Sequence, residues 1–376
     1  MKPSRLVGLP ICLLTLVVIA LGEGQSVRAA GFEIGIFTGG RTNDLPEIRA
    51  AGFDIVTGPA SRDFLNTARD LGLRVFASPG TSAGGRFSPK IAREAIQRFD
   101  RHPALWAWYL VDEPDLSGTP PEQVTAAQRF FKSVPARKPT AAVFFQGDES
   151  RYYSAIPDIV MVDKYPVPWL PLAAFGQHVE LARLSAGPKK PMFAIVQAFD
   201  WSYAAQVLPG ETNLRPPTRA EMRCMTYDAL ARGANGVFYY SHEMGAWKLR
   251  VQTEVWEDLQ AVVAEVRRLK PLFDGKHLWW HRRFEIPDRQ NRLNAALQPS
   301  VTTALMEVSK PEGMVASGRY LVAVNTTPVI QTVQFDGPQK GMASLAVLAQ
   351  NRMLIGINGV FTDRFEPYGV QVYGPF

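Results

Sequence analysis

The sequence is poor in cysteine, with two in 376 residues. One of them, Cys12, lies in an apolar run near the N-terminus that we interpret as part of a cleaved signal peptide, which leaves Cys224 alone in the exported chain. A single cysteine cannot form an internal disulfide, so stability must come from a hydrophobic core. Cys224 lies in a helix-like pattern, and we expect it to be a small buried hydrophobe.

The same apolar run indicates where the protein is expected. Lys2 and Arg5 precede the run "LVGLPICLLTLVVIALG", and Val27-Arg28-Ala29 fits the small-x-small pattern of a cleavage site. We therefore predict a signal peptide over residues 1–29 and export to the periplasm or the extracellular space. The alternative is an uncleaved membrane anchor, for which the run is slightly short.

Histidine is also scarce, and charge is not concentrated anywhere. The five histidines are scattered without ligand spacing, and no glycine-rich phosphate loop follows a strand, so we expect no metal and no cofactor. Loss of residues 1–29 removes Lys2, Arg5, Arg28 and Glu23, which lowers the formal net charge from +6 to +4. Lys and Arg are scattered, so neither a nucleic-acid nor a membrane partner is indicated, and without a dimerisation signal we expect a monomer.

Apolar, β-branched or aromatic runs alternate with helical patterns along most of the chain. The predicted strands span residues 32–37, 53–58, 73–78, 105–112, 140–146, 158–165, 192–199 and 236–242. Helix signals lie between them, among them Ser88-Pro89, Thr119-Pro120 and a capping box at Thr218 and Glu221. Eight is the number of strands that closes a parallel barrel, so we predict an α/β protein with a (β/α)8 barrel over residues 30–275.

The pattern changes after Gly275. Short alternating stretches such as "RYLVAVNTT", "TVQFDG" and "GVQVYGPF" are separated by turn residues, without a convincing amphipathic helix. We predict a small antiparallel β-sandwich over residues 276–376.

The fourth predicted strand, "WAWYLVDEPD", ends in adjacent acids. Active sites of parallel barrels lie at the carboxyl ends of the strands, so Asp112 and Glu113 are the first candidates. An acid that follows an apolar strand is partly desolvated, which raises its pKa and suits it to protonating a leaving group near neutral pH. A glycosidic oxygen needs such an acid, and we predict this role for Glu113.

The stretch "WYLVDEPD" resembles the strand-four signature of the large clan of retaining (β/α)8 glycoside hydrolases, in which Asn-Glu-Pro is usual. The resemblance implies that Glu113 is the general acid/base and that Asp112 takes the position of the asparagine that contacts the sugar. The segment "RPPTRAEMRCMTYDALARGANGVFYYSHE" and the C-terminal β domain also resemble these enzymes. Glycosidase activity on a polysaccharide or oligosaccharide is therefore expected.

One departure concerns the second carboxylate. The clan has its nucleophilic glutamate at the end of strand seven, where this sequence has Gln197. The candidates that remain are Asp163 in the last part of strand six, Glu243 after strand eight and Asp200 after strand seven. Glu243 lies across the barrel from Glu113, a separation that suits an inverting mechanism. A neighbouring acid pair, Asp112 with Glu113, is a further alternative that implies an N-acetylated sugar.

Polar and aromatic residues at the strand ends are candidates for substrate binding. Aromatic rings can stack on the C–H faces of sugars, although each one can equally be a core residue. The candidates are Asp112, Tyr165, Trp169, Gln197, Trp201, Tyr240, His242 and Trp247.

Two readings compete with the glycosidase. Gln197 at the nucleophile position is also typical of a barrel that binds glycan without cleaving it, and the fold alone does not exclude this. Lys164 follows strand six, where Schiff-base aldolases of this fold keep their lysine, so an aldolase is a more remote alternative.

Overall fold

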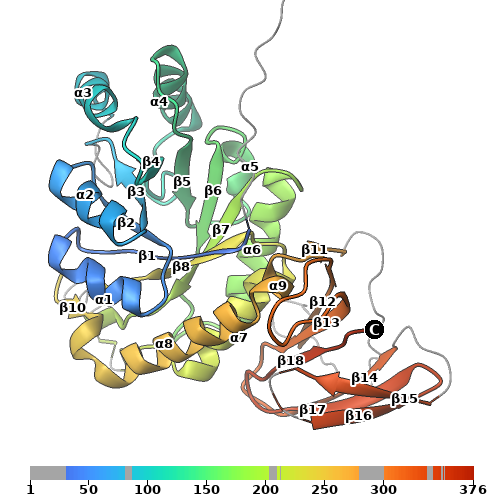
Figure 1. The fold of residues 1–376 in the computed structure, drawn as a ribbon. Coiled ribbons are helices and arrows are strands. Elements are labelled where there is room, and N and C mark those ends of the chain that lie inside the picture. Colours follow the sequence, from blue (N-terminus) through green and yellow to red (C-terminus); the bar gives the residue numbers. More distant parts are fainter. Residues whose placement is uncertain are drawn as a thin grey trace, which may run out of the picture.

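The computed structural model describes residues 31–80, 87–202, 210–211, 213–278, 300–336, 342–348, 350 and 352–376. It consists of a closed barrel of eight parallel strands with helices around it, followed by an antiparallel sheet (Figure 1). The predicted signal peptide, residues 1–29, lies outside the described residues. Among the described helices, none is both long and apolar enough to cross a membrane.

All eight predicted barrel strands are present. They are β1 (Glu33–Ile36), β2 (Ile55–Pro59), β3 (Arg74–Ser78), β4 (Leu105–Val111), β5 (Thr140–Phe144), β6 (Ile159–Asp163), β7 (Met192–Gln197) and β8 (Gly236–Tyr240). Each strand pairs in parallel with the next, and β8 closes the barrel on β1, with Ile36 opposite Tyr239. The predicted (β/α)8 barrel is therefore confirmed.

Helices surround the strands, and several begin where the sequence indicates. The α-helices are α1 (Leu45–Ala50), α2 (Arg62–Asp70), α3 (Pro89–Phe99), α4 (Pro121–Ser133), α5 (Ser150–Tyr153), α6 (Ala173–Ala186), α7 (Arg219–Ala231), α8 (Thr253–Arg268) and α9 (Lys270–Phe273), with short 3-10 turns η1 (Thr42–Asp44) and η3 (Leu249–Val251). The side chain of Ser88 caps α3, and the capping box of Thr218 and Glu221 is present at α7. Helix α4 begins one residue later than predicted, after Pro120.

The barrel interior is filled by large apolar side chains. Phe76, Phe193 and Phe238 meet there with ring centroids 5.2 to 6.1 Å apart, together with Ile195 and other buried residues. Gly35 on β1 faces Phe238 so closely that a Cβ atom there would lie 2.5 Å from the ring. The interior is therefore a packed core, and only its ends can carry a site.

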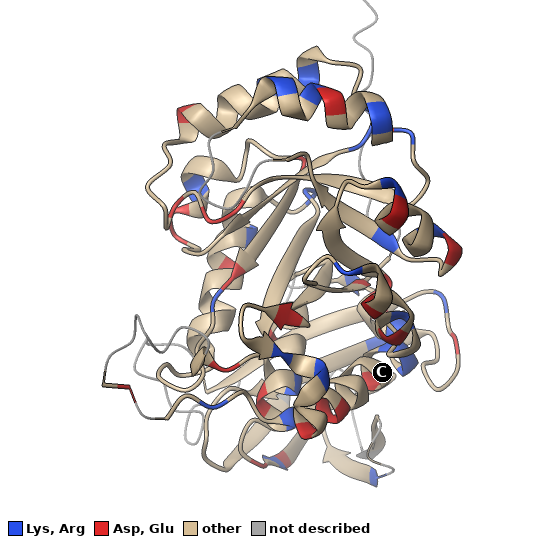
Figure 2. Ribbon diagram, turned by 90° about the vertical axis from the view of Figure 1, so that its left-hand side faces the viewer, with Lys and Arg blue, Asp and Glu red and all other residues tan. Residues whose placement is uncertain are grey.

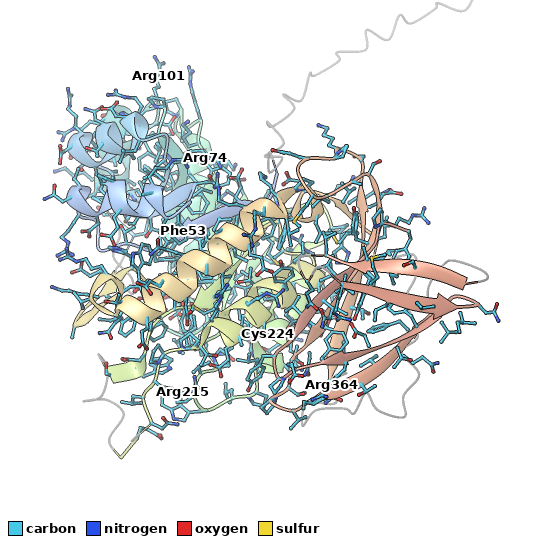
Figure 3. All side chains as sticks on the ribbon, turned by 60° about the horizontal axis from the view of Figure 1, so that its bottom comes forward. Phe53, Arg74, Arg101, Arg215, Cys224 and Arg364 are labelled. Carbon is cyan, nitrogen blue, oxygen red and sulfur yellow. The ribbon has the colours of Figure 1, made fainter. Side chains whose placement is uncertain are left out.

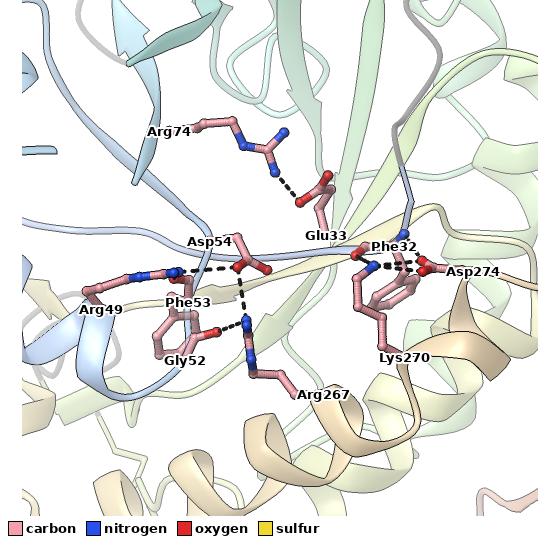
Figure 4. Close-up of polar contacts among 10 residues, drawn as sticks. All are labelled: Phe32, Glu33, Arg49, Gly52, Phe53, Asp54, Arg74, Arg267, Lys270 and Asp274. Carbon is pink, nitrogen blue, oxygen red and sulfur yellow. Dashed lines mark hydrogen bonds and ion pairs between the residues drawn. The ribbon is translucent and has the colours of Figure 1, made fainter. Parts of the chain in front are cut away.

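The charged residues at the amino end of the barrel pair with one another (Figure 4). Glu33 at the start of β1 forms an ion pair with Arg74 at the start of β3. Asp54 forms an ion pair with Arg267 of α8 at 2.9 Å. Asp274 forms an ion pair with Lys270 at 2.8 Å and accepts a hydrogen bond from the backbone N–H of Phe32. These pairs join the strand starts to α8 and α9, which is a structural role.

The C-terminal region forms one curled antiparallel sheet. Its strands are β11 (Lys276–His277), β12 (Val301–Val308), β13 (Gly318–Asn325), β14 (Gln331–Asp336), β15 (Met342–Val347), β16 (Arg352–Ile357), β17 (Val360–Phe365) and β18 (Val370–Tyr373), in the order β11-β12-β13-β18-β15-β16-β17-β14. A hairpin of β9 (Glu243–Met244) and β10 (Trp247–Lys248) follows β8. The predicted antiparallel β domain is confirmed, with its strands in a single curled sheet.

The sheet packs beside α7 and α9 of the barrel (Figure 1). Strand β13 is buried on both faces, with Val322 turned toward the core shared with the barrel and Leu321 toward the sheet's own core. Cys224 of α7 is buried at this junction, and its thiol lies 3.5 Å from the carbonyl oxygen of Asn325. The two parts share apolar core, and the cysteine belongs to it as predicted.

Candidate active site

The carboxyl ends of β4 and β6 bring two acids together. Glu113 follows β4 and Asp163 ends β6, two strands further around the barrel. The carboxyl groups of these two residues lie within hydrogen-bonding reach of each other, and the Tyr165 hydroxyl also lies close to Asp163. Glu113 is partly accessible, whereas Asp163 is only 3% exposed. Of the three predicted partners for Glu113, Asp163 is the one that contacts it.

The backbone of Glu113 has an unusual conformation. Its φ is +40°, in the left-handed region that non-glycine residues rarely adopt. Its N–H donates to the carbonyl of Val143 in β5 at 3.0 Å, and its own carbonyl accepts from Leu116 and Ser117. Such a conformation costs on the order of 1–3 kcal/mol and persists where surrounding contacts enforce it, often at functional sites. The turn therefore aims the Glu113 carboxyl at Asp163.

The acid pair retains protons to higher pH than isolated carboxyl groups do. Burial raises the pKa of Glu113, and the charges of Asp112 and Asp115 act in the same direction, although the hydrogen bond to Asp163 opposes them. Burial and the charge of Glu113 raise the pKa of Asp163 well above its usual range. The Oδ1 atom of Asp163 is buried, and no group among the described residues donates a hydrogen bond to it. The raised pKa values of both acids favour a proton on this pair.

Asp112 lies beside this pair and accepts a hydrogen bond from the hydroxyl of Tyr109. Burial raises the pKa of Asp112, and the Tyr109 hydrogen bond partly offsets this. Tyr109 and Asp112 are three residues apart, and in a regular strand such residues point to opposite faces. However, the register of β4 against β5 shifts between Tyr109 and Val111. This bulge adds one residue to the alternation, so the side chains of Tyr109 and Asp112 point to the same face and can bond.

Two contributors were not predicted as site residues. Tyr109 binds Asp112, and Asp115 accepts the backbone N–H groups of Phe145 at 3.2 Å and Gln146 at 2.6 Å. Asp115 thereby ties the turn after β4 to the end of β5. The only sequence signal was the proximity of both residues to Glu113.

Gln197 at the end of β7 is fully buried. Its oxygen accepts from the N–H of Val167 at 2.9 Å, and its nitrogen donates to the carbonyls of Val167 at 2.9 Å and Phe199 at 3.1 Å. These bonds hold the loop after β6 against β7. The structure thus places Gln197 in a bracing position, where its amide is already bonded to protein.

The other two candidate acids, Glu243 and Asp200, contact residues other than Glu113. Glu243 forms an ion pair with Arg41 from the loop after β1. Asp200 accepts the backbone N–H of Ser202 at 2.8 Å and also its hydroxyl, which is a local turn. Both acids are partly accessible.

Aromatic rings run from the barrel axis to the surface of the loops. Tyr165 stacks on Tyr240, with centroids 5.5 Å apart and planes 22° apart, and Trp201 lies 6.2 Å from Tyr165. Trp169 packs 5.5 Å from Trp201 and is 41% exposed. Phe37, which follows β1, packs 5.2 Å from Tyr240. The predicted residues Tyr165, Trp169, Trp201 and Tyr240 are thus one continuous group.

His242 and Trp247 lie away from this surface. His242 is fully buried against Trp256 of α8, and burial lowers its pKa although Asp44 and Glu47 face it at 3.8 and 3.9 Å. Trp247 is 3% exposed and donates to the carbonyl of Ser241 at 3.1 Å. The structure does not bring either side chain to the acid pair.

Lys164 follows Asp163 and lies on the other side of the strand. Its Nζ is 4.1 Å from the ring centroid of Phe145. Burial lowers the pKa of Lys164, and nearby acids, Asp163 first among them, counteract this. Within the described ranges, no group of histidine, cysteine, aspartate and glutamate side chains could hold a metal ion.

The fold is that of TIM-barrel glycoside hydrolases. A glycoside hydrolase family 5 protein from Bacteroides vulgatus is 13% identical, with a TM-score of 0.60 over 91% of this chain and 89% of that one. A family 42 β-galactosidase from G. stearothermophilus is 9% identical, with a TM-score of 0.58 over 92% and 98%. An alpha-amylase from Geobacillus thermoleovorans, complexed with acarbose, is 11% identical, with a TM-score of 0.55 over 91% and 97%.

These similarities extend over the barrel and the C-terminal sheet together. The sequence matches no protein-family model and no curated protein. At identities of 9–13% the matches define the fold of the chain. The chemistry must be argued from the residues of this protein.

Proposed function

We propose that the protein is a glycoside hydrolase that cleaves a polysaccharide or oligosaccharide, with Glu113 as the general acid. The observation that carries the proposal is the contact between Glu113 and Asp163 at the carboxyl end of the barrel. A glycosidic oxygen leaves as an alkoxide unless an acid protonates it, and two carboxyl groups on either side of the bond are the usual solution.

The raised pKa of Glu113 suits this role. An ordinary glutamate has a pKa of about 4.3 and is almost fully ionised at neutral pH. Burial and the neighbouring aspartates raise the pKa of Glu113, so a larger fraction of it carries a proton. Partial accessibility leaves the carboxyl open to a sugar.

Asp163 is the second carboxylate of the proposed reaction. Carboxyl groups lie about 5–5.5 Å apart in retaining enzymes and about 6.5–9.5 Å apart in inverting ones. The hydrogen bond between Glu113 and Asp163 is shorter than either separation. A bound sugar must therefore part the two groups, and the anomer of the product distinguishes a nucleophilic Asp163 from one that activates water.

The aromatic group formed by Tyr165, Tyr240, Trp201 and Trp169 is the proposed sugar platform. Trp169 is its exposed end, whereas Tyr165 hydrogen-bonds to Asp163 and so joins the platform to the acids. Aromatic faces bury the C–H surface of a sugar ring while its hydroxyls stay hydrated. We propose further that the enzyme works outside the cytoplasm after removal of residues 1–29, which N-terminal sequencing of the exported protein tests.

The test is reducing-end release from a panel of plant and bacterial polysaccharides. The mature protein is compared with Glu113→Gln and with a control, Glu94→Gln. Glu94 is exposed on α3 and forms no ion pair with another described residue. We expect release by the wild type and the control, and a fall of about 10²–10⁴-fold in Glu113→Gln.

Two outcomes would contradict the proposal. Equal release by Glu113→Gln and wild type would remove Glu113 from the chemistry. Absence of release from every glycan, with binding to one of them unchanged by the substitution, would favour the alternative in which the barrel binds glycan without cleaving it. Gln197, an amide at the usual nucleophile position, motivates that alternative.

A further inference from the structure

A cavity of about 890 Å³ lies between the barrel and the C-terminal sheet, away from the strand ends. Its walls come from α7, the end of α8, and β16 to β18 with the turn before β18. Figure 3 shows this side of the molecule, with Arg364 on the sheet and Cys224 inside the junction. Five arginines line the cavity: Arg219, Arg223, Arg268, Arg352 and Arg364.

Two of these arginines are held in place by acids. Arg223 donates from Nε to both oxygens of Glu265, at 2.9 and 3.0 Å. Arg352 forms a two-pronged pair with Asp363, at 3.0 and 2.6 Å. Such pairs fix the guanidinium planes, so these arginines form a pre-ordered wall.

The other three arginines are open to a ligand. Arg219, the first residue of α7, and Arg268, the last of α8, are exposed and have no hydrogen bond or ion pair with another described residue. Among the described residues, the guanidinium group of Arg364 pairs only with the exposed Glu366, at 3.5 Å. The lining contains five arginines against three acids, so it has two positive charges in excess.

Charges elsewhere on the barrel are mixed in sign. Figure 2 shows Lys and Arg interspersed with Asp and Glu on the helices. An excess of unpaired arginine around a concave site is therefore a local feature. The cavity volume lies within the roughly 300–1,000 Å³ range of small-molecule sites.

We propose that this cavity is a second carbohydrate site, which binds the carboxylate groups of an acidic saccharide such as a uronic-acid oligomer. The guanidinium fork matches a carboxylate in two parallel hydrogen bonds, which favours arginine over lysine here. Gln350, Gln371 and Tyr368 also line the cavity and can bond to sugar hydroxyls. The choice of a saccharide ligand rests on the proposed function, whereas the cavity itself lies apart from the acid pair and shares no residue with it.

The test measures binding of a galacturonate tetramer by titration calorimetry. The background is Glu113→Gln, so that cleavage does not interfere. The variant Arg219→Gln/Arg268→Gln is compared with the control Arg62→Gln/Arg98→Gln. Arg62 is the first residue of α2 and Arg98 lies in the last turn of α3, and both are exposed without a described partner, so the control removes the same charge from matched helix positions.

We expect the cavity variant to bind the acidic tetramer at least about 10-fold more weakly and the control to stay within about twofold, since only the cavity variant loses charge-assisted hydrogen bonds. A neutral galactose tetramer and inorganic sulfate should bind much more weakly than the acidic tetramer. Equal losses in both variants would indicate only a general charge effect. Sulfate binding as tight as that of the tetramer would indicate a plain anion site. Either result overturns the proposal, and Arg364→Gln provides an independent variant.

Discussion

The carboxyl group of Glu113, after β4, hydrogen-bonds to that of Asp163, at the end of β6. Two ionised carboxylates repel each other, so this contact requires a proton between them at the pH where it forms. Neither acid forms an ion pair with another described residue, and the Nζ of Lys164 lies 4.1 Å from the ring centroid of Phe145. The raised pKa values of both acids thus favour a bound proton on this pair at the carboxyl end of the barrel.

The first prediction concerns stability and pH. The folded pKa values of Glu113 and Asp163 are raised, so their contribution to stability is complete below the unfolded values of about 4 and is lost as the pH rises through the folded values. Asp163→Asn removes this loss. We expect its melting temperature to exceed that of wild type at pH 8, by about 1–2 °C per kcal/mol relieved, and the gap to narrow toward pH 4.

The control for that experiment is Asp148→Asn, which changes an exposed aspartate in the loop after β5. Melting curves between pH 4 and pH 8 check both variants. A gap between Asp163→Asn and wild type that does not vary with pH would mean that no buried proton is involved.

The second prediction separates proton donation from binding. If Glu113 supplies the proton, Glu113→Gln should slow cleavage of a natural glycan by about 10²–10⁴-fold. A dinitrophenyl glycoside has a leaving group that needs no proton, so its cleavage should slow much less. The ratio of kcat/KM for the two substrates is the measurement. Equal losses on both substrates would assign Glu113 a positioning role.

The eight strands were predictable because each is an uninterrupted apolar run, and a parallel barrel buries both faces of its strands. The acids after β4 were predictable for the same reason, since Asp112 and Glu113 end such a run. The pairing of Glu113 with Asp163 followed only as one of three choices, because side-chain direction beyond a strand end depends on backbone angles that the sequence does not reveal.

Three particular features explain the rest. The bulge between Tyr109 and Val111 shifts the alternation by one residue, and no glycine or proline marks it. The positive φ of Glu113 likewise occurs at a residue type that does not favour it. The role of Gln197 depended on Val167, which is 30 residues away in the chain, so its hydrogen bonds could not be inferred from neighbours.

The third prediction concerns Gln197→Glu, the change that restores an acid at the usual nucleophile position. The amide nitrogen now donates to the carbonyls of Val167 and Phe199, and a carboxylate there would face both oxygens without a donor. We expect a loss of about 1–3 kcal/mol of stability and no gain in activity. Urea unfolding beside Gln97→Glu, an exposed site on α3, is the check. Higher activity without destabilisation would show that this loop can rearrange.

The fourth prediction concerns the junction of barrel and sheet. Arg232 is 5% exposed, donates to Asp228 at 3.1 Å and to Thr302 of β12 at 3.1 Å, and pairs with Glu180. Arg232→Ala leaves the buried Asp228 without its counterion and should cost about 3–5 kcal/mol. Arg49→Ala, which breaks a partly exposed pair with Asp54, should cost about 1 kcal/mol or less. Similar midpoints in denaturant for the two variants would contradict this.

The last prediction tests the aromatic platform. Trp169 is the exposed end of the proposed platform and packs at a tilt against Trp201, so Trp169→Ala removes an exposed ring with little loss of core. An aromatic contact is worth about 0.5–1.5 kcal/mol, which corresponds to roughly 2–10-fold in affinity for a glycan that binds the proposed platform. Leu170→Ala, at the next exposed position, controls for loop disturbance. Retardation in gels that contain the glycan measures both, and equal retardation of Trp169→Ala and wild type would exclude Trp169 from sugar binding.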